Sequence, residues 1–286
     1  MTIGKLLITG ATRLKEAGID NPAREVELFL AHILKSKRID MYLNSNNLVS
    51  EEQICIYNEF IERRISKEPV AYIIGSQEFR HLTFKVNRNV LIPRPETELL
   101  AEHALEIIDK NMKGYEILDL CTGSGVLAVS IQKRFPFIKM SASDISTKAL
   151  KVAGENALLN GVFEKISFFK SDLFKGIKKG KKFHMIISNP PYVPREEMKK
   201  LMDDVRLFEP KEALDGGREG LKFYKEIIKK APDFLFPGGY LALEIGFGQA
   251  DKIRNLFNEN GKFDILRLVR DYAAIERVLI AKAKNG

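Results

Sequence analysis

Apolar residues recur at helical spacing through the first 65 residues of the chain. Three segments show the pattern, at 3–17, 22–34 and 51–65. Asn21-Pro22 supplies an N-cap and a proline at the first position of the second helix, and Ser50 with Gln53 forms a capping box ahead of the third. The pattern predicts a helical bundle over residues 1–75.

The pattern changes to strand-like alternation after residue 68. Leu82, Phe84 and Val86 alternate with polar residues, so residues 68–89 are expected to form a β-hairpin that links two domains. A proline-stiffened stretch follows and enters a helix at Pro95 or Thr97. The predicted domains are a helical domain at 1–75, a hairpin linker at 76–95 and a larger domain at 96–286.

Strand and helix patterns alternate from residue 116 to the end of the chain. Strands are predicted at 117–120, 139–143, 166–169, 183–188, 240–245, 264–269 and 278–281, with helices at 126–134 and 147–159 between the first of them. Such alternation predicts an α/β fold with a mostly parallel sheet. The last two strands have no helix between them and are expected to form an antiparallel pair at one edge.

Composition narrows the class of protein. The 286 residues give a prior of about two domains, and no apolar run approaches the roughly 20 residues of a membrane span, so we expect a cytoplasmic protein. The net charge of +8 lies after residue 80, and its densest lysine cluster, at 175–182, has the composition of a solvated loop more than of a phosphate-binding patch. Cys55 and Cys121 form neither a zinc spacing nor a disulfide framework, and no metal site is expected.

A glycine-rich loop follows the strand at 117–120 and opens a helix. Gly123, Gly125 and Ala128 loosely fit a dinucleotide fingerprint, with Asp144 about 20 residues further on where a ribose-binding acid belongs. An NAD enzyme is therefore one reading. Asp119 argues against it, because a carboxylate at the strand tip repels a pyrophosphate but attracts the sulfonium and ammonium of S-adenosylmethionine.

Two residues of this loop have alternative roles. Asp119 could instead be a helix-capping acid. Cys121 near a helix N-terminus could be a nucleophile, although a small side chain that fits a tight loop is the preferred interpretation. The loop has no Lys-Ser/Thr after its glycines, which argues against a P-loop nucleotidase.

The strand at 183–188 delivers the turn Asn189-Pro190-Pro191-Tyr192. The two prolines stiffen the turn and remove two backbone donors, so it presents mainly acceptors beside an aromatic ring. That set suits a planar group that carries an NH2, either an amide or the exocyclic amine of a base. A simple loop breaker is the alternative. His184 inside the strand is expected to be a core histidine and not a base.

These motifs and several longer blocks make the chain similar to the HemK/PrmC family of peptide chain release factor glutamine N5-methyltransferases. The blocks that carry the resemblance are 68–75, 92–98, 119–125, 189–192, 209–214, 217–221 and 244–246. The resemblance implies a helical N-terminal domain that docks the release factor, a hairpin linker, and a class I S-adenosylmethionine-dependent methyltransferase domain with a Rossmann-like sheet. The implied substrate is the glutamine of a Gly-Gly-Gln loop.

The resemblance also implies roles for individual residues. The loop Cys121-Thr122-Gly123-Ser124-Gly125 would hold the methionine part of S-adenosylmethionine, Asp144 the ribose, and Leu173 the adenine side, and Asp119 ahead of the glycines would also bind the cofactor. Asn189, which also contacts the cofactor, would receive the glutamine together with Pro190, Pro191 and Tyr192, and Asn189, Pro190 and Tyr192 would be the catalytic set. The chain departs from the family at His81, Cys121 and Ala274, where glycine is usual.

Two other classes of protein remain open at this point. A DNA adenine N6-methyltransferase would share the pocket but needs a basic module to extrude a base, and the sequence shows none. A non-catalytic regulatory protein that binds the cofactor would not need an intact Asn189 turn. We expect a monomer with release factors as protein partners and no stable nucleic-acid partner.

Overall fold

The structure is a computed structural model that describes residues 1–108 and 114–285, and it divides into two compact units. The first unit comprises Met1–Gly75 and Met202–Phe208, and the second comprises Ser76–Leu201 and Glu209–Gly286. No helix in the described part of the chain has both the length and the apolar character needed to cross a membrane.

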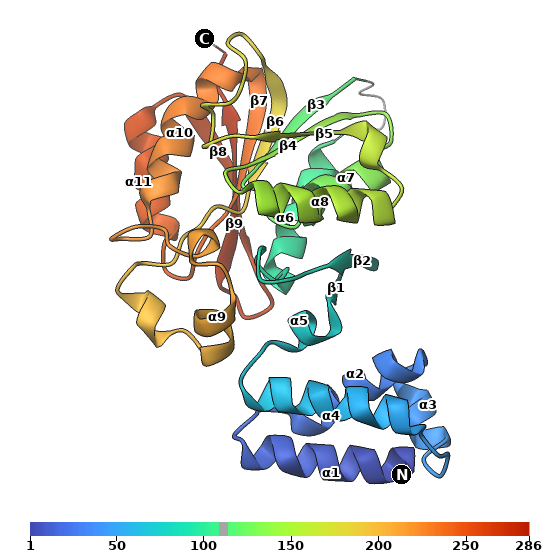
Figure 1. Ribbon diagram of the computed structural model, residues 1–286. Helices are drawn as coiled ribbons and strands as arrows, with labels where there is room; N and C mark the ends of the chain where they lie inside the picture. The colour runs from blue at the N-terminus through green and yellow to red at the C-terminus, as the bar shows by residue number, and fades with distance from the viewer. Residues whose placement is uncertain (109–113, 286) are drawn as a thin grey trace. The chain divides into compact units, whose positions relative to one another are not determined.

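The first unit is an all-helical bundle, as predicted (Figure 1). Its helices are α1 (Ile3–Glu16), α2 (Pro22–Leu34), α3 (Arg38–Leu43), α4 (Glu51–Ile65), α5 (Val70–Ile74) and α9 (Asp203–Phe208). Phe29 and Ile61 lie in its core, and Tyr57 crosses from α4 to donate to the Leu6 carbonyl at 2.8 Å. A Cβ on Gly10 would lie 1.7 Å from the Tyr57 hydroxyl, so α1 and α4 approach closely only because this residue is glycine.

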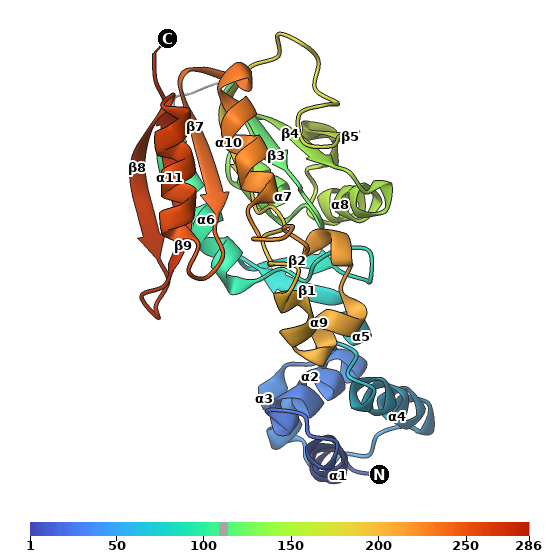
Figure 2. The ribbon, with the colours of Figure 1, turned by 90° about the vertical axis from the view of Figure 1, so that its left-hand side faces the viewer.

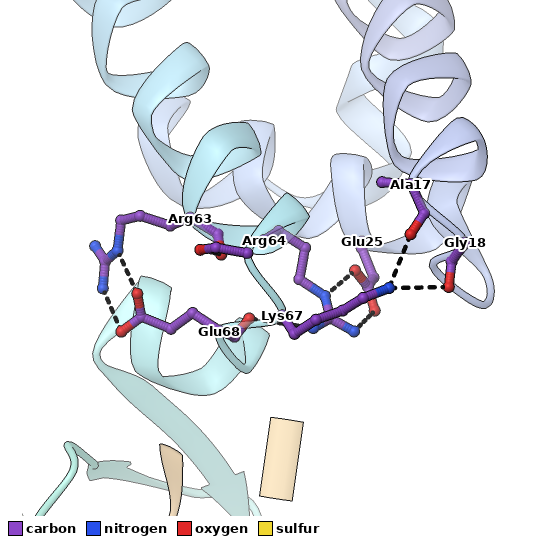
Figure 3. Close-up of polar contacts among 8 residues, drawn as sticks. Ala17, Gly18, Glu25, Arg63, Arg64, Lys67 and Glu68 are labelled. Atoms are coloured by element: carbon purple, nitrogen blue, oxygen red, sulfur yellow. Dashed lines mark hydrogen bonds and ion pairs between the residues drawn. The ribbon is translucent and has the colours of Figure 1, made fainter. Parts of the chain in front are cut away.

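The C-terminus of α4 is held by charged side chains (Figure 3). Arg64 is buried, pairs with both oxygens of Glu25 at 2.7 and 3.2 Å, and donates to the Glu68 carbonyl at 3.2 Å. Lys67 donates to the Ala17 carbonyl at 2.8 Å, beyond the end of α1. The bidentate pair is directional and fixes the end of α4 against the first turn of α2, while Lys67 connects the same end to α1.

The predicted capping is confirmed at the start of α4 but not at the start of α2. Ser50 and Gln53 form the expected capping box, with each backbone N–H bonded to the other side chain at 3.2 Å. Pro22 is the first residue of α2 as predicted, but Asn21 has a φ of 53° and its side chain makes no capping hydrogen bond. Asn21 therefore suits this position because asparagine tolerates the left-handed region, and not because it caps the helix.

The prediction of a hairpin from residue 68 is wrong at its beginning. Residues 70–74 form the short helix α5, because the Pro69 carbonyl accepts from the N–H groups of Tyr72 and Ile73. Gly75, with a φ of 81°, ends it. The hairpin belongs to the second unit and consists of β1 (Ser76–Phe79) and β2 (Leu82–Lys85) in antiparallel register.

The second unit is built on a seven-stranded sheet in the order β5-β4-β3-β6-β7-β9-β8. Its strands are β3 (Glu116–Leu120), β4 (Lys139–Asp144), β5 (Ile166–Lys170), β6 (Phe183–Ser188), β7 (Leu235–Glu244), β8 (Phe263–Arg270) and β9 (Glu276–Ala283). The strands from β5 to β7 pair in parallel, and β9 runs antiparallel to β7 and β8. The predicted parallel sheet with an antiparallel edge pair is confirmed.

Helices cover both faces of this sheet (Figures 1 and 2). One face carries α6 (Pro95–Ile107), α7 (Val126–Arg134) and α8 (Thr147–Leu159), and the other carries α10 (Lys222–Phe234) and α11 (Ala250–Asn260). Alternate residues of each central strand enter two separate cores: Ile117 of β3 packs under α7, whereas Leu118 packs under α10.

The chain changes direction at β3. From β3 it continues to β4 and β5 on one side of the sheet, and then returns to place β6 on the other side. The carboxyl ends of β3 and β6 therefore diverge at a topological switch point, where open α/β sheets bind their ligands.

Candidate active site at the carboxyl edge of the sheet

A cavity of about 850 Å³ lies at this switch point, entirely within the second unit. Its walls come from the loops after β3, β4, β5 and β6, from residues 88–97 and from segments between 210 and 223. Eight of the residues singled out from the sequence line it, namely Cys121, Thr122, Gly123, Ser124, Asp144, Leu173, Asn189 and Pro191. The lining found among the described residues does not include the other four, which are Asp119, Gly125, Pro190 and Tyr192.

Asp119 supports the glycine-rich loop from inside. It is fully buried, and its Oδ2 accepts from the Thr122 hydroxyl at 2.6 Å and from the Ala128 N–H, in the first turn of α7, at 3.2 Å. Asp119 is thus a helix-capping acid, the alternative role considered for it. Its Oδ1 is buried and has no hydrogen-bond partner within the described ranges, and burial raises the pKa of this carboxyl to about 7.

Asp144 joins the second strand to the same loop. Its Oδ2 accepts from the Gly123 N–H and its Oδ1 from the Ser146 N–H, both at 2.9 Å. Burial raises the pKa of Asp144, against these two backbone donors. Each oxygen keeps a further lone pair, so the carboxylate can accept from two neighbouring hydroxyl groups at the cavity wall.

The two glycines and Cys121 set the shape of the loop. A Cβ on Gly125 would lie 3.0 Å from the Ala153 Cβ, so this glycine permits close packing against α8. Gly123 lines the cavity at a φ of 55°, and Cys121 adopts a φ of 59°. Burial, with Asp144 and Asp119 adding to it, raises the pKa of the Cys121 thiol, which favours the protonated form over the thiolate that a nucleophile needs.

Asn189 is joined to two residues that sequence reasoning did not assign to the site. Its Nδ2 donates to the Thr97 hydroxyl at 3.1 Å, and that hydroxyl donates to Glu244 Oε2 at 2.6 Å. Glu244 ends β7, is buried, and accepts from the Tyr192 hydroxyl at 3.3 Å through its other oxygen. A carboxylate at the end of the apolar run Leu241-Ala242-Leu243 was the sequence signal for it.

Tyr192 is anchored at both ends. Besides its hydroxyl contact with Glu244, its carbonyl accepts from Gln249 Nε2 at 3.0 Å, and Gln249 Oε1 accepts from the Gly246 N–H at 3.2 Å. Both the hydroxyl and the backbone of Tyr192 are therefore held in place. His184, in contrast, is half-buried and stacks on Tyr115 at 4.5 Å, and it does not line the cavity found in the described chain.

The arrangement fits S-adenosylmethionine. Asp119 carries a buried oxygen with no partner in the described chain, and a carboxylate behind the loop is compatible with a sulfonium and an ammonium group but not with a pyrophosphate. Asp144 offers acceptors for a diol, and Leu173 an apolar surface. The fold and this site define a class I methyltransferase that uses S-adenosylmethionine.

Comparisons with known proteins identify the family. Residues 5–75 match the family "PrmC N-terminal domain" and residues 95–218 match "Methyltransferase small domain". The chain is 43% identical over 266 residues to the release factor glutamine methyltransferase of Thermodesulfovibrio yellowstonii, covering 92% of this chain and 93% of that protein. It is 38% identical over 283 residues to that of Clostridium botulinum, with 99% of each chain covered. The chain belongs to the family of release factor glutamine methyltransferases.

Solved structures agree on the fold of the larger unit. A ribosomal protein L11 methylase from Lactobacillus delbrueckii subsp. bulgaricus is 21% identical with a TM-score of 0.53, covering 73% of this chain and 99% of that one. A methyltransferase from Pyrococcus furiosus is 18% identical with a TM-score of 0.53, covering 82% of this chain and 100% of that one. At these identities the likeness concerns the fold alone.

Proposed function

We propose that this protein transfers a methyl group from S-adenosylmethionine to the side-chain nitrogen (N5) of the glutamine in the Gly-Gly-Gln loop of class I peptide chain release factors. The observation that carries the proposal is the Asn189 amide at the wall of the cavity. Its NH2 is engaged by Thr97, so its Oδ1 remains as an acceptor on the same cavity that the glycine-rich loop and Asp144 line. The names of the full-length relatives support release factors as the substrate.

The residues suit an amide nucleophile. An amide nitrogen attacks poorly because its lone pair is delocalised, so catalysis depends on alignment and on acceptors for the positive charge that develops on nitrogen. S-adenosylmethionine supplies the electrophilic methyl group on its sulfonium. Asn189 Oδ1 and the Pro190 carbonyl would accept from the two N–H groups of the substrate, while Pro191 and Tyr192 would bound the pocket. No histidine or lysine base is assigned, since the nitrogen becomes acidic only as the new bond forms.

The remaining roles are also proposals. The cofactor roles of Asp119, Asp144, Leu173 and the loop 121–125 rest on their places at or behind the cavity. The helical unit contributes no residue to the cavity lining found in the described chain, and docking of the release factor is its proposed use. We propose that the protein acts as a monomer in the cytoplasm, where release factors work, without a stable nucleic-acid partner.

Incubation with labelled S-adenosylmethionine tests the proposal. Separate reactions would contain an intact class I release factor, a release factor whose Gly-Gly-Gln glutamine is replaced by Glu, duplex DNA and free glutamine. We expect label on the first protein only. Label on DNA would instead support an adenine methyltransferase, and no label on any substrate despite cofactor binding would support a non-catalytic regulator.

A further inference from the structure

One carboxylate connects both ends of the Asn189–Tyr192 turn. Glu244 Oε2 accepts from Thr97, which accepts from Asn189, and Glu244 Oε1 accepts from Tyr192. Thr97 comes from the first turn of α6, and Glu244 from the end of β7, so neither belongs to the turn itself.

The order of donors in this chain determines which way the Asn189 amide faces. An ionised carboxylate only accepts, so above the pKa of Glu244, where kcat and peptide binding are to be measured, the single hydroxyl proton of Thr97 goes to Glu244. The Thr97 oxygen can then only accept, and the group that reaches it from Asn189 must be the NH2. Asn189 Oδ1 is thereby left for the cavity. Without the Thr97 hydroxyl, nothing in this chain of hydrogen bonds prevents the Asn189 amide from rotating by 180° and presenting its NH2 to the substrate.

We infer that Glu244, acting through Thr97 and Tyr192, is a positioning residue that sets the Asn-Pro-Pro-Tyr turn to accept hydrogen bonds from an NH2 group and to reject a carboxylate. The inference rests on the proposed glutamine substrate. It adds a selectivity function to Glu244, which is not among the described residues that line the cavity, and to Thr97, whose hydroxyl at the cavity wall bonds Glu244 and Asn189. Thr97 and Glu244 are both buried, so water does not replace the missing partner when one is changed.

Thr97→Val and Thr97→Ser form the central comparison. Valine has the shape of threonine without the hydroxyl, whereas serine keeps the hydroxyl. We expect Thr97→Val to lower kcat about tenfold to a hundredfold, because the acceptor is misplaced, while the affinity for S-adenosylmethionine stays within about twofold. Thr97→Ser should retain most of the wild-type kcat. Thr83→Val, at an exposed position of β2, is the matched control and should leave kcat unchanged.

The preference between a glutamine and a glutamate peptide provides a second measurement, which would not change if Thr97 and Glu244 only stabilised the fold. The full-length protein, loaded with S-adenosylhomocysteine, would be titrated with two peptides that carry Gly-Gly-Gln and Gly-Gly-Glu. The wild type should prefer the glutamine peptide, and Thr97→Val should lose most of that preference, since a rotated Asn189 can donate to the carboxylate. Glu244→Gln should lower kcat as well, because it offers one oxygen and one NH2 to two hydroxyl donors.

Each outcome decides the question. A Thr97→Val protein with wild-type kcat and wild-type peptide preference would overturn the inference, as would a Thr97→Ser protein as impaired as Thr97→Val. If Thr97→Val does not fold, Glu244→Gln with unaltered kcat and preference would overturn it. Failure of the proposed function looks different, because the wild type itself would then bind neither peptide and methylate no release factor.

Discussion

Asn156 bonds both backbone groups of Lys85. Its Oδ1 accepts from the Lys85 N–H at 2.6 Å and its Nδ2 donates to the Lys85 carbonyl at 3.0 Å. The same Nδ2 donates to the Ser124 carbonyl at 2.8 Å, and the side chain is fully buried in α8. One amide therefore joins the hairpin strand β2 to the glycine-rich loop.

Asn156→Ala should lower the free energy of unfolding by about 3 kcal/mol, because it leaves three backbone groups without their partner, the Ser124 carbonyl in a buried place and the two groups of Lys85 in a half-buried one. Urea denaturation followed by circular dichroism measures the change. Asn160→Ala is the control: its Nδ2 donates to the Thr83 carbonyl of the same hairpin in an exposed contact and to the Asn156 carbonyl at 2.9 Å, both at the end of α8, and its loss should cost under about 1 kcal/mol. Equal effects of the two variants would contradict the role given to Asn156.

The buried carboxyl of Glu244 should make stability depend on pH. Burial, with Glu96 adding to it, raises the pKa of Glu244 from 4.5 to about 7, against the contrary effects of Thr97, Tyr192 and Arg277. The folded protein therefore holds a proton that the unfolded chain releases, so stability falls as pH rises from about 4.5 to about 7, by on the order of 3 kcal/mol. Glu244→Gln removes this titration.

The measurement is the difference in unfolding free energy between wild type and Glu244→Gln at pH 5 and pH 8. We expect the wild type to lose stability relative to the variant at the higher pH. Asp119→Asn should show the same sign, since burial raises the pKa of Asp119 from 3.8 to about 7. A pH-independent difference would mean that these carboxyls titrate near their ordinary values.

Three positions at which the chain departs from the family pattern have a left-handed backbone, a feature that hydrophobic periodicity does not predict. His81, Cys121 and Ala274 stand where related sequences usually carry glycine, and their φ angles are 62°, 59° and 61°. All three lie in the left-handed region that glycine enters without strain. A glycine that is usual in the family thus indicated a left-handed residue in the hairpin turn, in the glycine-rich loop and in the β8–β9 turn, although this chain has other residues at all three positions.

His81→Gly and Ala274→Gly should each raise the free energy of unfolding by about 0.5–1 kcal/mol, because the left-handed strain that is relieved exceeds the entropy that glycine adds to the unfolded chain. Neither side chain lines the cavity. Urea denaturation of each variant tests this, with Thr83→Gly in the extended strand β2 as a control that should be destabilising. A loss of stability at both turn positions would show that their side chains contribute more than the strain costs.

The sheet, its edge pair and the residues that follow each strand could be predicted because alternation and short loops are local signals. The helix α5 could not, since its apolar β-branched residues suit a strand and only Pro69 and Gly75 turn them into one helical turn. Thr97 and Glu244 lie 147 residues apart in sequence, and no local pattern predicts that they share a hydrogen bond. The lining of the candidate site was therefore predictable where single loops form it and unpredictable where elements meet.

Asp144→Ala should weaken S-adenosylmethionine binding by about tenfold to a hundredfold, since charge-assisted hydrogen bonds contribute roughly 1.5–3 kcal/mol each. The variant also frees the N–H groups of Gly123 and Ser146. Isothermal titration calorimetry measures the affinity. Asp144→Asn keeps the shape of the side chain and one acceptor, so its affinity for S-adenosylmethionine should lie between those of the wild type and Asp144→Ala. Unchanged affinity in both variants would remove Asp144 from the proposed cofactor site.

The last prediction concerns Asn189, whose replacement by Ala should lower kcat by orders of magnitude with little change in melting temperature. The lost acceptor matters most as the substrate nitrogen becomes positive, so the affinity for S-adenosylmethionine should change less than turnover. Single-turnover methylation of a release factor and thermal melts separate these effects.

Asn189→Asp is the companion variant. It keeps an acceptor toward the cavity but replaces the NH2 that Thr97 accepts, so a second anion would face Thr97 beside Glu244. If accepting from the substrate is the main role of Asn189, the Asp variant should retain more activity than the Ala variant. An Asp variant as inactive as Ala would shift the emphasis to the contact with Thr97. Wild-type turnover in Asn189→Ala would show instead that this turn does not receive the reacting nitrogen, and the proposed function would then rest on family membership without a site.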